Sequence, residues 1–161
     1  MPNSQPIPAS PQPAIDIAAL MRRLDAEQAE ARKLVEPNKH ALFAVLAPVG
    51  ITRVTVTFDG GGDSGQIEAV DAFCGEETAA LPDGEVTLSR RSYRSDEIEL
   101  VALSVPEAIE DLCYALLGQE HGGWENNEGG YGEFVFDVTA DRIDLNMNIR
   151  IESSEYHGHQ W

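Results

Sequence analysis

Long apolar runs are absent from this sequence. The longest uninterrupted one, Ala41 to Ala47, is far shorter than the roughly 20 residues that a membrane-spanning helix needs. Residues 1–14 are rich in proline and lack both the cationic start and the apolar block of a secretory signal. The sequence therefore predicts a disordered lead over residues 1–14, no membrane segment and a cytoplasmic location.

Cysteine is also scarce. Cys74 and Cys113 are the only two, and they lack the spacing of metal ligands, so reduced thiols are expected rather than a disulfide framework or a zinc site. Cys113 falls on the apolar side of a predicted helix and is expected to be a small core residue. The sequence contains no Walker loop and no His-Glu-x-x-His motif, so the common P-loop and zinc hydrolase mechanisms are excluded. No cofactor is expected.

Basic residues are few. The 161 residues include 11 Lys and Arg against 28 Asp and Glu, for a net charge of -17. Residues 1–40 hold five acids and five bases, so the whole excess lies from Ala41 onward. Such a field disfavours direct nucleic-acid binding, and it favours solubility, a cationic protein partner or metal ions.

Residue periodicity divides the remaining chain. Residues 15–50 read as a helical pair, in which an amphipathic helix from Asp16 ends at Pro37 and Asn38 caps a shorter second helix. Residues 51–156 read as the core of the same single domain, and residues 157–161 as a mobile tail. Ser104-Val-Pro-Glu107 is a capping box that begins a helix in this core.

Alternating apolar and polar residues predict the strands of this core. They span Ile51 to Phe58, Gln66 to Phe73, Val86 to Ser89, Ile98 to Ala102, Glu133 to Val138 and residues 142–152. One-faced strands joined by hairpins, with few helices between them, indicate the α+β class. We expect an antiparallel sheet of about four to six strands with helices packed on one face, plus an N-terminal helical arm.

Two glycine-rich acidic loops, Asp59–Gln66 and Trp124–Glu133, adjoin these strands and carry the candidate site. Glycine allows close approach of the backbone to a ligand, and carboxylates and amides supply hydrogen bonds or metal ligands. The metal-ligand candidates are Asp59, Asp63, Asn126 and Glu128. The binding candidates are Asp59, Asp63, Ser64, Gln66, Trp124, Glu125, Asn126, Asn127, Tyr131 and Glu133.

Three familiar motifs fail on their context in these loops. Gly62-Asp63-Ser64-Gly65 matches the nucleophile string of trypsin-like proteases, but the chain is too short for that fold's two barrels. The Gly-x-Gly-x-x-Gly pattern from Gly60 precedes a predicted strand rather than the helix that dinucleotide binding needs. The acid spacing does not fit an EF-hand, although a cation site assembled from both loops stays open.

A row of polar residues is expected on the two C-terminal strands. Glu133 and Asp137 on one strand should share a face with Asp144, Asn146 and Asn148 on the next. Such a row serves either acid-base chemistry or solubility, and its like charges need Arg142, Arg150 or a cation to offset them.

The loop motifs resemble those of a bacterial domain-of-unknown-function family. The resemblance covers about Asp16 to Tyr156 and implies a short, single-domain cytoplasmic bacterial protein, of a kind that is sometimes carried on plasmids or other mobile elements. It implies no catalytic residue, because the family has no assigned activity. The segments that carry it are Ala41-Leu-Phe-Ala44, Ile51-Thr-x-Val-Thr-Val-Thr-Phe-Asp-Gly60, Gly62-Asp-Ser-Gly-Gln-Ile-Glu68, Leu103-Ser-Val105, Ala108-Ile-Glu110, Gly123-Trp-Glu-Asn-Asn127 and Gly130-Tyr-Gly-Glu-Phe-Val-Phe-Asp-Val138.

Two functional hypotheses follow from charge and loops. The first is an acidic, non-enzymatic module that binds a cationic protein, as antirestriction DNA mimics do. The second is a metal-dependent or acid-base enzyme that uses the two loops with Glu133 and Asp137, which requires the loops to meet beside a pocket.

Overall fold

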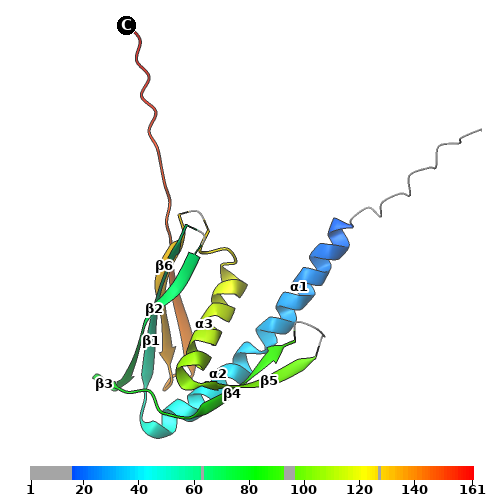
Figure 1. The fold of residues 1–161 in the computed structure, drawn as a ribbon, viewed down its shortest axis with the longest axis vertical. Helices are drawn as coiled ribbons and strands as arrows, with labels where there is room; N and C mark the ends of the chain where they lie inside the picture. The colour runs from blue at the N-terminus through cyan, green and yellow to red at the C-terminus, as the bar shows by residue number, and fades with distance from the viewer. Residues whose placement is uncertain (1–15, 63, 93–96, 127) are drawn as a thin grey trace, which may run out of the picture.

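The computed structural model describes residues 16–62, 64–92, 97–126 and 128–161 (Figure 1). The predicted lead over residues 1–14 and the candidates Asp63 and Asn127 lie outside this part. The described helices are α1 (Ile17–Lys33), α2 (Val35–Leu46), the short 3-10 helix η1 (Ala47–Val49) and α3 (Val105–Glu120). The strands are β1 (Arg53–Gly61), β2 (Ser64–Cys74), β3 (Glu77–Ala79), β4 (Glu85–Arg91), β5 (Ile98–Ser104), β6 (Gly130–Asp137) and β7 (Arg142–Ile149).

The described strands form two antiparallel sheets. The larger has the order β3-β2-β1-β6-β7, and β4 pairs with β5 in a separate hairpin. Helices α2 and α3 pack on one face of the larger sheet, here called the inner face, and α3 runs alongside it in Figure 1. The predicted α+β class, with helices on one face of an antiparallel sheet, is confirmed.

Alternation along β1 decides which side chains enter the core. Val54, Val56 and Phe58 are at most 2% exposed and point to the inner face, whereas the intervening residues point to the outer face. Phe134 and Phe136 of β6 extend this apolar surface, and both are fully buried. Burying one such side chain contributes about 1.5–3 kcal/mol, so these two central strands anchor the sheet to the helices.

Helix α3 begins and packs as its sequence predicts. The Ser104 hydroxyl accepts from the Glu107 amide at 3.3 Å, and the Glu107 carboxylate accepts from the Ser104 amide at 3.1 Å. This reciprocal capping box satisfies two amides that a helix start otherwise leaves unpaired. Cys113 is fully buried in the core, as expected, and the free thiol of Cys74 is exposed.

Asn38 has a different role from the predicted one. Helix α2 already begins at Val35 and carries Pro37 in its first turn, where a missing amide hydrogen costs nothing. The Asn38 side chain instead accepts from the Ser89 amide at 2.8 Å and donates to the Ser89 carbonyl at 2.9 Å. Asn38 therefore binds the edge of β4 to α2 rather than capping a helix.

The two ends of the described chain lead away from the core. Helix α1 has no buried residue, and Figure 1 shows it extending outward from α2. Residues 151–161 are exposed and contain neither helix nor strand. None of the helices in the described ranges is long and apolar enough to cross a membrane.

Candidate functional site

The two glycine-rich loops meet at one end of the large sheet, where Trp124 packs on the backbone of the first loop. Gly60 and Gly65 are paired across β1 and β2. A Cβ atom at Gly60 would lie 2.5 Å from the Trp124 ring, and one at Gly65 would also overlap it. The indole also meets Phe58 edge-on, with ring centroids 5.3 Å apart. The two glycines are therefore needed to make room for an aromatic ring.

Backbone contacts complete this junction of the loops. Gly129 has a φ of +76°, and a Cβ there would collide with the Gly60 carbonyl oxygen. A Cβ at Gly61 would lie 3.3 Å from the Glu128 carbonyl oxygen. The positive φ and the close approach together require glycine at position 129. The sequence leaves open whether the two loops meet, and in the structure they do so through backbone packing.

Arg150, just beyond β7, contacts residues of both loops at this junction. Its guanidinium donates to the Gly60 carbonyl at 3.0 Å and lies 2.9 Å from a carboxylate oxygen of Asp59. The same group lies 4.8 Å from the centroid of the Tyr131 ring, and the Arg150 amide donates to Gly129 at 3.0 Å. Asp59, a metal-ligand candidate from the sequence, is thus already paired with the guanidinium of Arg150. From the sequence, Arg150 is expected only as a counter-charge for the polar face of the sheet.

The candidate residues divide between two sides of the sheet. Asp59 lies opposite Gln66 and Tyr131 in the strand register, so these three side chains share the outer face. Trp124 lies on the inner face, against Phe58. The remaining described candidates are Ser64 at the start of β2, Glu133 on β6, and Glu125, Asn126 and Glu128 in the segment between α3 and β6.

Two small open pockets border the junction. One of about 270 Å³ lies over the first loop and is lined by Asp59, Ser64, Gln66 and Glu68. Another of about 310 Å³ lies beside the second loop, with Trp124, Asn126 and Arg150 among its lining residues. The loops therefore converge in backbone, while their polar side chains border separate pockets.

The polar row of the C-terminal strands lies on one face as predicted. Glu133 is opposite Asn146, Asp137 is opposite Arg142, and Tyr131 is opposite Asn148. Arg142 lies 2.8 Å from Asp144 and 3.9 Å from Asp137. The hydrogen bond to Asp144, followed by the attraction of the two carboxylates, raises the pKa of Arg142 above its ordinary value.

Three acids on the same face stand apart from these pairs. Glu68 and Asp71 on β2 and Glu133 on β6 belong to no ion pair among the residues that the structure describes. Among the described residues, the one hydrogen bond that Glu68 accepts comes from the side-chain amide of Gln66, at 3.2 Å. The third arginine of the face, Arg53, lies over the Phe73 ring at 4.5 Å from its centroid. The outer face consequently keeps unneutralised carboxylates.

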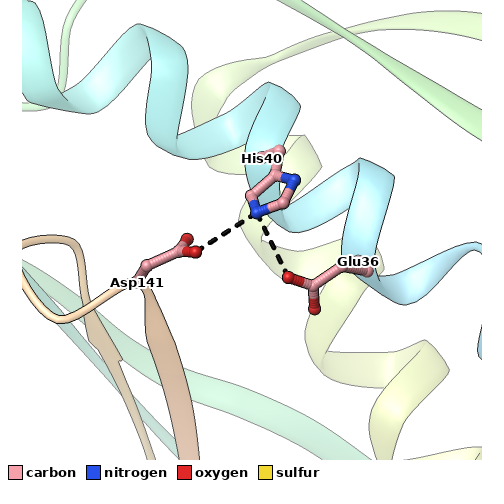
Figure 2. Close-up of side chains that lie close together, drawn as sticks. All are labelled: Glu36, His40 and Asp141. Atoms are coloured by element: carbon pink, nitrogen blue, oxygen red, sulfur yellow. Dashed lines mark hydrogen bonds and ion pairs between the residues drawn. The ribbon is translucent and has the colours of Figure 1, made fainter.

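A second polar cluster, which the sequence reasoning missed, joins α2 to the turn between β6 and β7 (Figure 2). Nε2 of His40 lies 3.1 Å from Glu36 and 3.2 Å from Asp141. Glu36 and His40 are four residues apart on a helix, a spacing that is visible in the sequence. Asp141 comes from a turn a hundred residues later, at a φ of 54°, and nothing in the sequence joins it to them.

The donor set of this cluster, two carboxylates and an imidazole, is of a kind that holds divalent cations. Lys39 supplies a positive charge to the same carboxylates. Its ammonium lies 2.9 Å from Glu36 and 3.6 Å from Asp141, and it donates to the Asp141 carbonyl at 2.8 Å. Lys39 is only 8% exposed, so its buried charge needs these partners. The cluster thus links α2 to the β6–β7 turn through ion pairs.

Comparison with known proteins places the larger part of the chain in one family model. A family of unknown function, DUF6878, matches residues 34–161. The match begins directly after α1 and includes both loops, the whole sheet and the last residue. No curated protein and no solved structure matches the chain.

Proposed function

The chain belongs to DUF6878, a family of unknown function, and we propose that it is a non-enzymatic module that binds a basic protein through the outer face of its large sheet. The observation that carries the proposal is the exposure of three acids: Asp71 and Glu133 lie on that face by strand register, and Glu68, at the register shift of β2, is hydrogen-bonded to Gln66 of the same face. These acids have no ion-pair partner within the described ranges, whereas the face's arginines are engaged by an acid or an aromatic ring.

The charge of the whole chain supports the same partner chemistry. The net charge of -17 attracts cationic surfaces over a distance of about 8 Å at physiological ionic strength and repels phosphate groups. Acidic faces that meet basic faces accelerate association and select partners by charge. A partner whose basic surface otherwise holds nucleic acid fits this chemistry. An antirestriction-type accessory protein of a bacterial mobile element, acting in the cytoplasm, is one version of the proposal, and the family resemblance of the loop motifs is compatible with it.

The competing enzyme hypothesis places catalysis or a metal ion at the two loops. We prefer the binding role because the loop groups are engaged in holding the fold. Asp59 is paired with Arg150, and Trp124 is packed on Gly60 and Gly65. An enzyme would need these groups available for substrate or metal.

Affinity capture with a matched variant tests the proposal. The full chain is immobilised beside a triple variant, Glu68→Gln, Asp71→Asn and Glu133→Gln, which removes three charges from the outer face. A control variant, Asp83→Asn, Glu85→Gln and Glu99→Gln, removes three exposed acids around the β4–β5 hairpin. Proteins captured from a bacterial extract are then identified by mass spectrometry at rising salt concentration.

The expected result is a basic protein that the wild type and the control capture equally and the outer-face variant captures much less. Its capture should decline as salt screens the charges. Equal capture by all three baits, or capture that salt does not affect, contradicts the proposal.

A further inference from the structure

Strand β7 lies at the edge of the large sheet. It is last in the strand order, and among the described strands it pairs with β6 alone. The Arg150 amide donates to the Gly129 carbonyl, and a Cβ at Gly132 would collide with a backbone oxygen of β7, that of Asn146. Both contacts show that the even-numbered residues direct their backbone groups toward β6, because the hydrogen-bonded pairs of an antiparallel ladder alternate. The odd-numbered residues from 143 to 149 therefore present their amides and carbonyls to the outer edge.

This edge lacks the features that keep edge strands from pairing with other chains. Residues 142–149 contain no proline, glycine or lysine, and their register with β6 has no shift. The opposite edge of the sheet, β3, is protected by its length of only three residues. The side chains of β7 that point to the inner face are all apolar: Ile143, Leu145, Met147 and Ile149. A long, regular edge of this kind is a template for a further strand.

The strand pattern of the sequence continues past the end of β7. Apolar and polar residues alternate from Arg142 to Glu152, whereas β7 ends at Ile149, opposite the first residue of β6. Figure 1 shows the chain after β7 leading away from the sheet, and Ile151 is 88% exposed. The sequence thus holds a longer strand than β6 pairs with.

We propose that the chain forms a symmetric dimer in which β7 pairs antiparallel with β7 of a second copy, centred on Met147. Residues 150–152 continue the strand in this dimer, and the two large sheets join into one. The odd-numbered residues, whose backbone groups already point outward, form the hydrogen-bonded pairs between the copies.

This register matches charge and hydrophobicity at once. Every apolar residue lies opposite an apolar residue, and every charged residue lies opposite one of the other sign. A shift of the centre by one residue in either direction sets like charges opposite each other, either Arg142 and Arg150 or Asp144 and Glu152. The pairs in the proposed register are Arg142–Glu152, Ile143–Ile151, Asp144–Arg150, Leu145–Ile149, Asn146–Asn148 and Met147–Met147.

The same register brings exposed apolar side chains to an open pocket. A pocket of about 330 Å³ lies between α2, α3 and β7, and Leu116, Ile143 and Leu145 are among its lining residues. Ile149 and Ile151, at the other end of the paired segment, are 55% and 88% exposed. In the dimer these two isoleucines lie opposite Leu145 and Ile143 of the other copy, beside its pocket. Removal of these side chains from water favours the dimer.

The charge of the paired segment is compatible with self-association. From Arg142 to Glu152 there are two acids and two bases, so the segment is neutral although the whole chain carries -17. Repulsion between the remaining charges is screened over about 8 Å at physiological ionic strength. Because the copies meet at the sheet edge, the outer face of each stays open, and the dimer does not depend on the proposed binding of a basic protein.

Mass measurement on the full chain tests the dimer. Sedimentation equilibrium over a range of concentrations should give about twice the mass of the 17.5 kDa chain. Ile151→Asp places a charge opposite Ile143 and should raise the Kd of the dimer at least tenfold. The control Tyr156→Asp adds the same charge to the same tail, outside the paired segment, and should change the Kd less than twofold. Ile151 and Tyr156 are 88% and 92% exposed, so circular dichroism should show an unchanged fold in both variants.

A monomeric wild type at all concentrations overturns the proposal, and so do equal effects of the two substitutions. Cysteine cross-linking in a Cys74→Ser background tests the register. Arg142→Cys chains mixed with Glu152→Cys chains should form mixed disulfides, because these positions form a non-hydrogen-bonded pair with Cα atoms about 4.5 Å apart. Two Arg142→Cys chains should not cross-link, since these positions lie about 34 Å apart along the strands. Cross-links between identical Arg142→Cys chains contradict the antiparallel register.

Discussion

Trp124 gives the glycines of the first loop their structural reason. The sequence suggests that these glycines provide backbone freedom or approach to a ligand. Gly60 and Gly65 are needed because they have no side chain: the indole of Trp124 occupies the space that a Cβ atom would fill at either position. The partner of these glycines is some 60 residues away in the sequence, so only the structure identifies it.

Replacement of Gly65 by alanine should lower the free energy of unfolding by about 1–3 kcal/mol, because the new methyl group must displace the Trp124 ring. Urea denaturation followed by tryptophan fluorescence measures the loss. The matched control is Gly118→Ala in α3, where an added Cβ meets no atom within 4 Å. It should raise the stability by about 0.5–1 kcal/mol. Equal effects of the two substitutions would contradict the packing role of Gly65.

The buried thiol of Cys113 should make the free energy of unfolding fall as the pH rises above neutrality. Burial in the core, with a smaller contribution from Glu110, raises the pKa of its thiol well above the ordinary value. Because the folded-state pKa is the higher one, the unfolded chain releases this proton first, from about pH 8.5. The free energy of unfolding should therefore fall by about 1.4 kcal/mol for each pH unit between pH 9 and 10.

Urea denaturation at pH 8, 9 and 10 measures this slope. The variant Cys113→Ala should lose the contribution of the thiol, whereas Cys74→Ala, which alters an exposed thiol, should keep it. A slope that Cys113→Ala leaves unchanged rules out the thiol as its source.

At the scale of elements, α2 is the hub that joins the parts of the fold. Asn38 binds β4, the Lys39 and His40 side chains bind the β6–β7 turn, and Phe43 meets Phe136 of β6 edge-on at 6.4 Å. One helix of 12 residues thus contacts both sheets. Three successive polar side chains, Asn38 to His40, take part in joining α2 to other elements, an arrangement that the apolar pattern of the helix does not disclose.

Replacement of Asn38 by alanine should lower the free energy of unfolding by about 1–3 kcal/mol, because the amide and the carbonyl of Ser89 both lose their partner. Hydrogen exchange of the Ser89 amide should become faster as the β4–β5 hairpin loosens from α2. Asn148→Ala, on the exposed outer face of β7, is the control and should change stability by less than about 0.5 kcal/mol. Unchanged exchange at Ser89 in the Asn38 variant would show that the hairpin is held by other contacts.

The sequence predicts the helices and strands better than it predicts the contacts between them. Alternation locates β1, β6 and β7 and assigns their two faces, because side chains alternate strictly along a strand. The capping box locates the start of α3. Pro37 misleads, because proline is as compatible with the first turn of α2 as with the end of the preceding helix. The Glu36–His40–Asp141 cluster is out of reach, since its third member depends on how the β6–β7 turn meets α2.

At the scale of the whole molecule, the order of the strands and the contacts between the two loops depend on the tertiary structure. Periodicity does not reveal that β1 lies between β2 and β6, and this adjacency brings the two loops together. Arg150 then donates a hydrogen bond to the Gly60 carbonyl, and Trp124 packs on Gly60 and Gly65, so both residues hold the loops together at one end of the sheet. The described helices pack on the inner face and leave open the outer face, which carries Glu68, Asp71 and Glu133.

The most direct test of the account compares the affinity of the captured basic partner for three proteins at 50–300 mM salt. These are the wild type, the outer-face triple variant at Glu68, Asp71 and Glu133, and the control triple variant at Asp83, Glu85 and Glu99. Both variants differ from the wild type by three charges, so net charge alone predicts equal effects. We expect at least a tenfold rise in Kd for the outer-face variant and less than a twofold rise for the control. Equal weakening of the two variants would contradict a binding site on the outer sheet face.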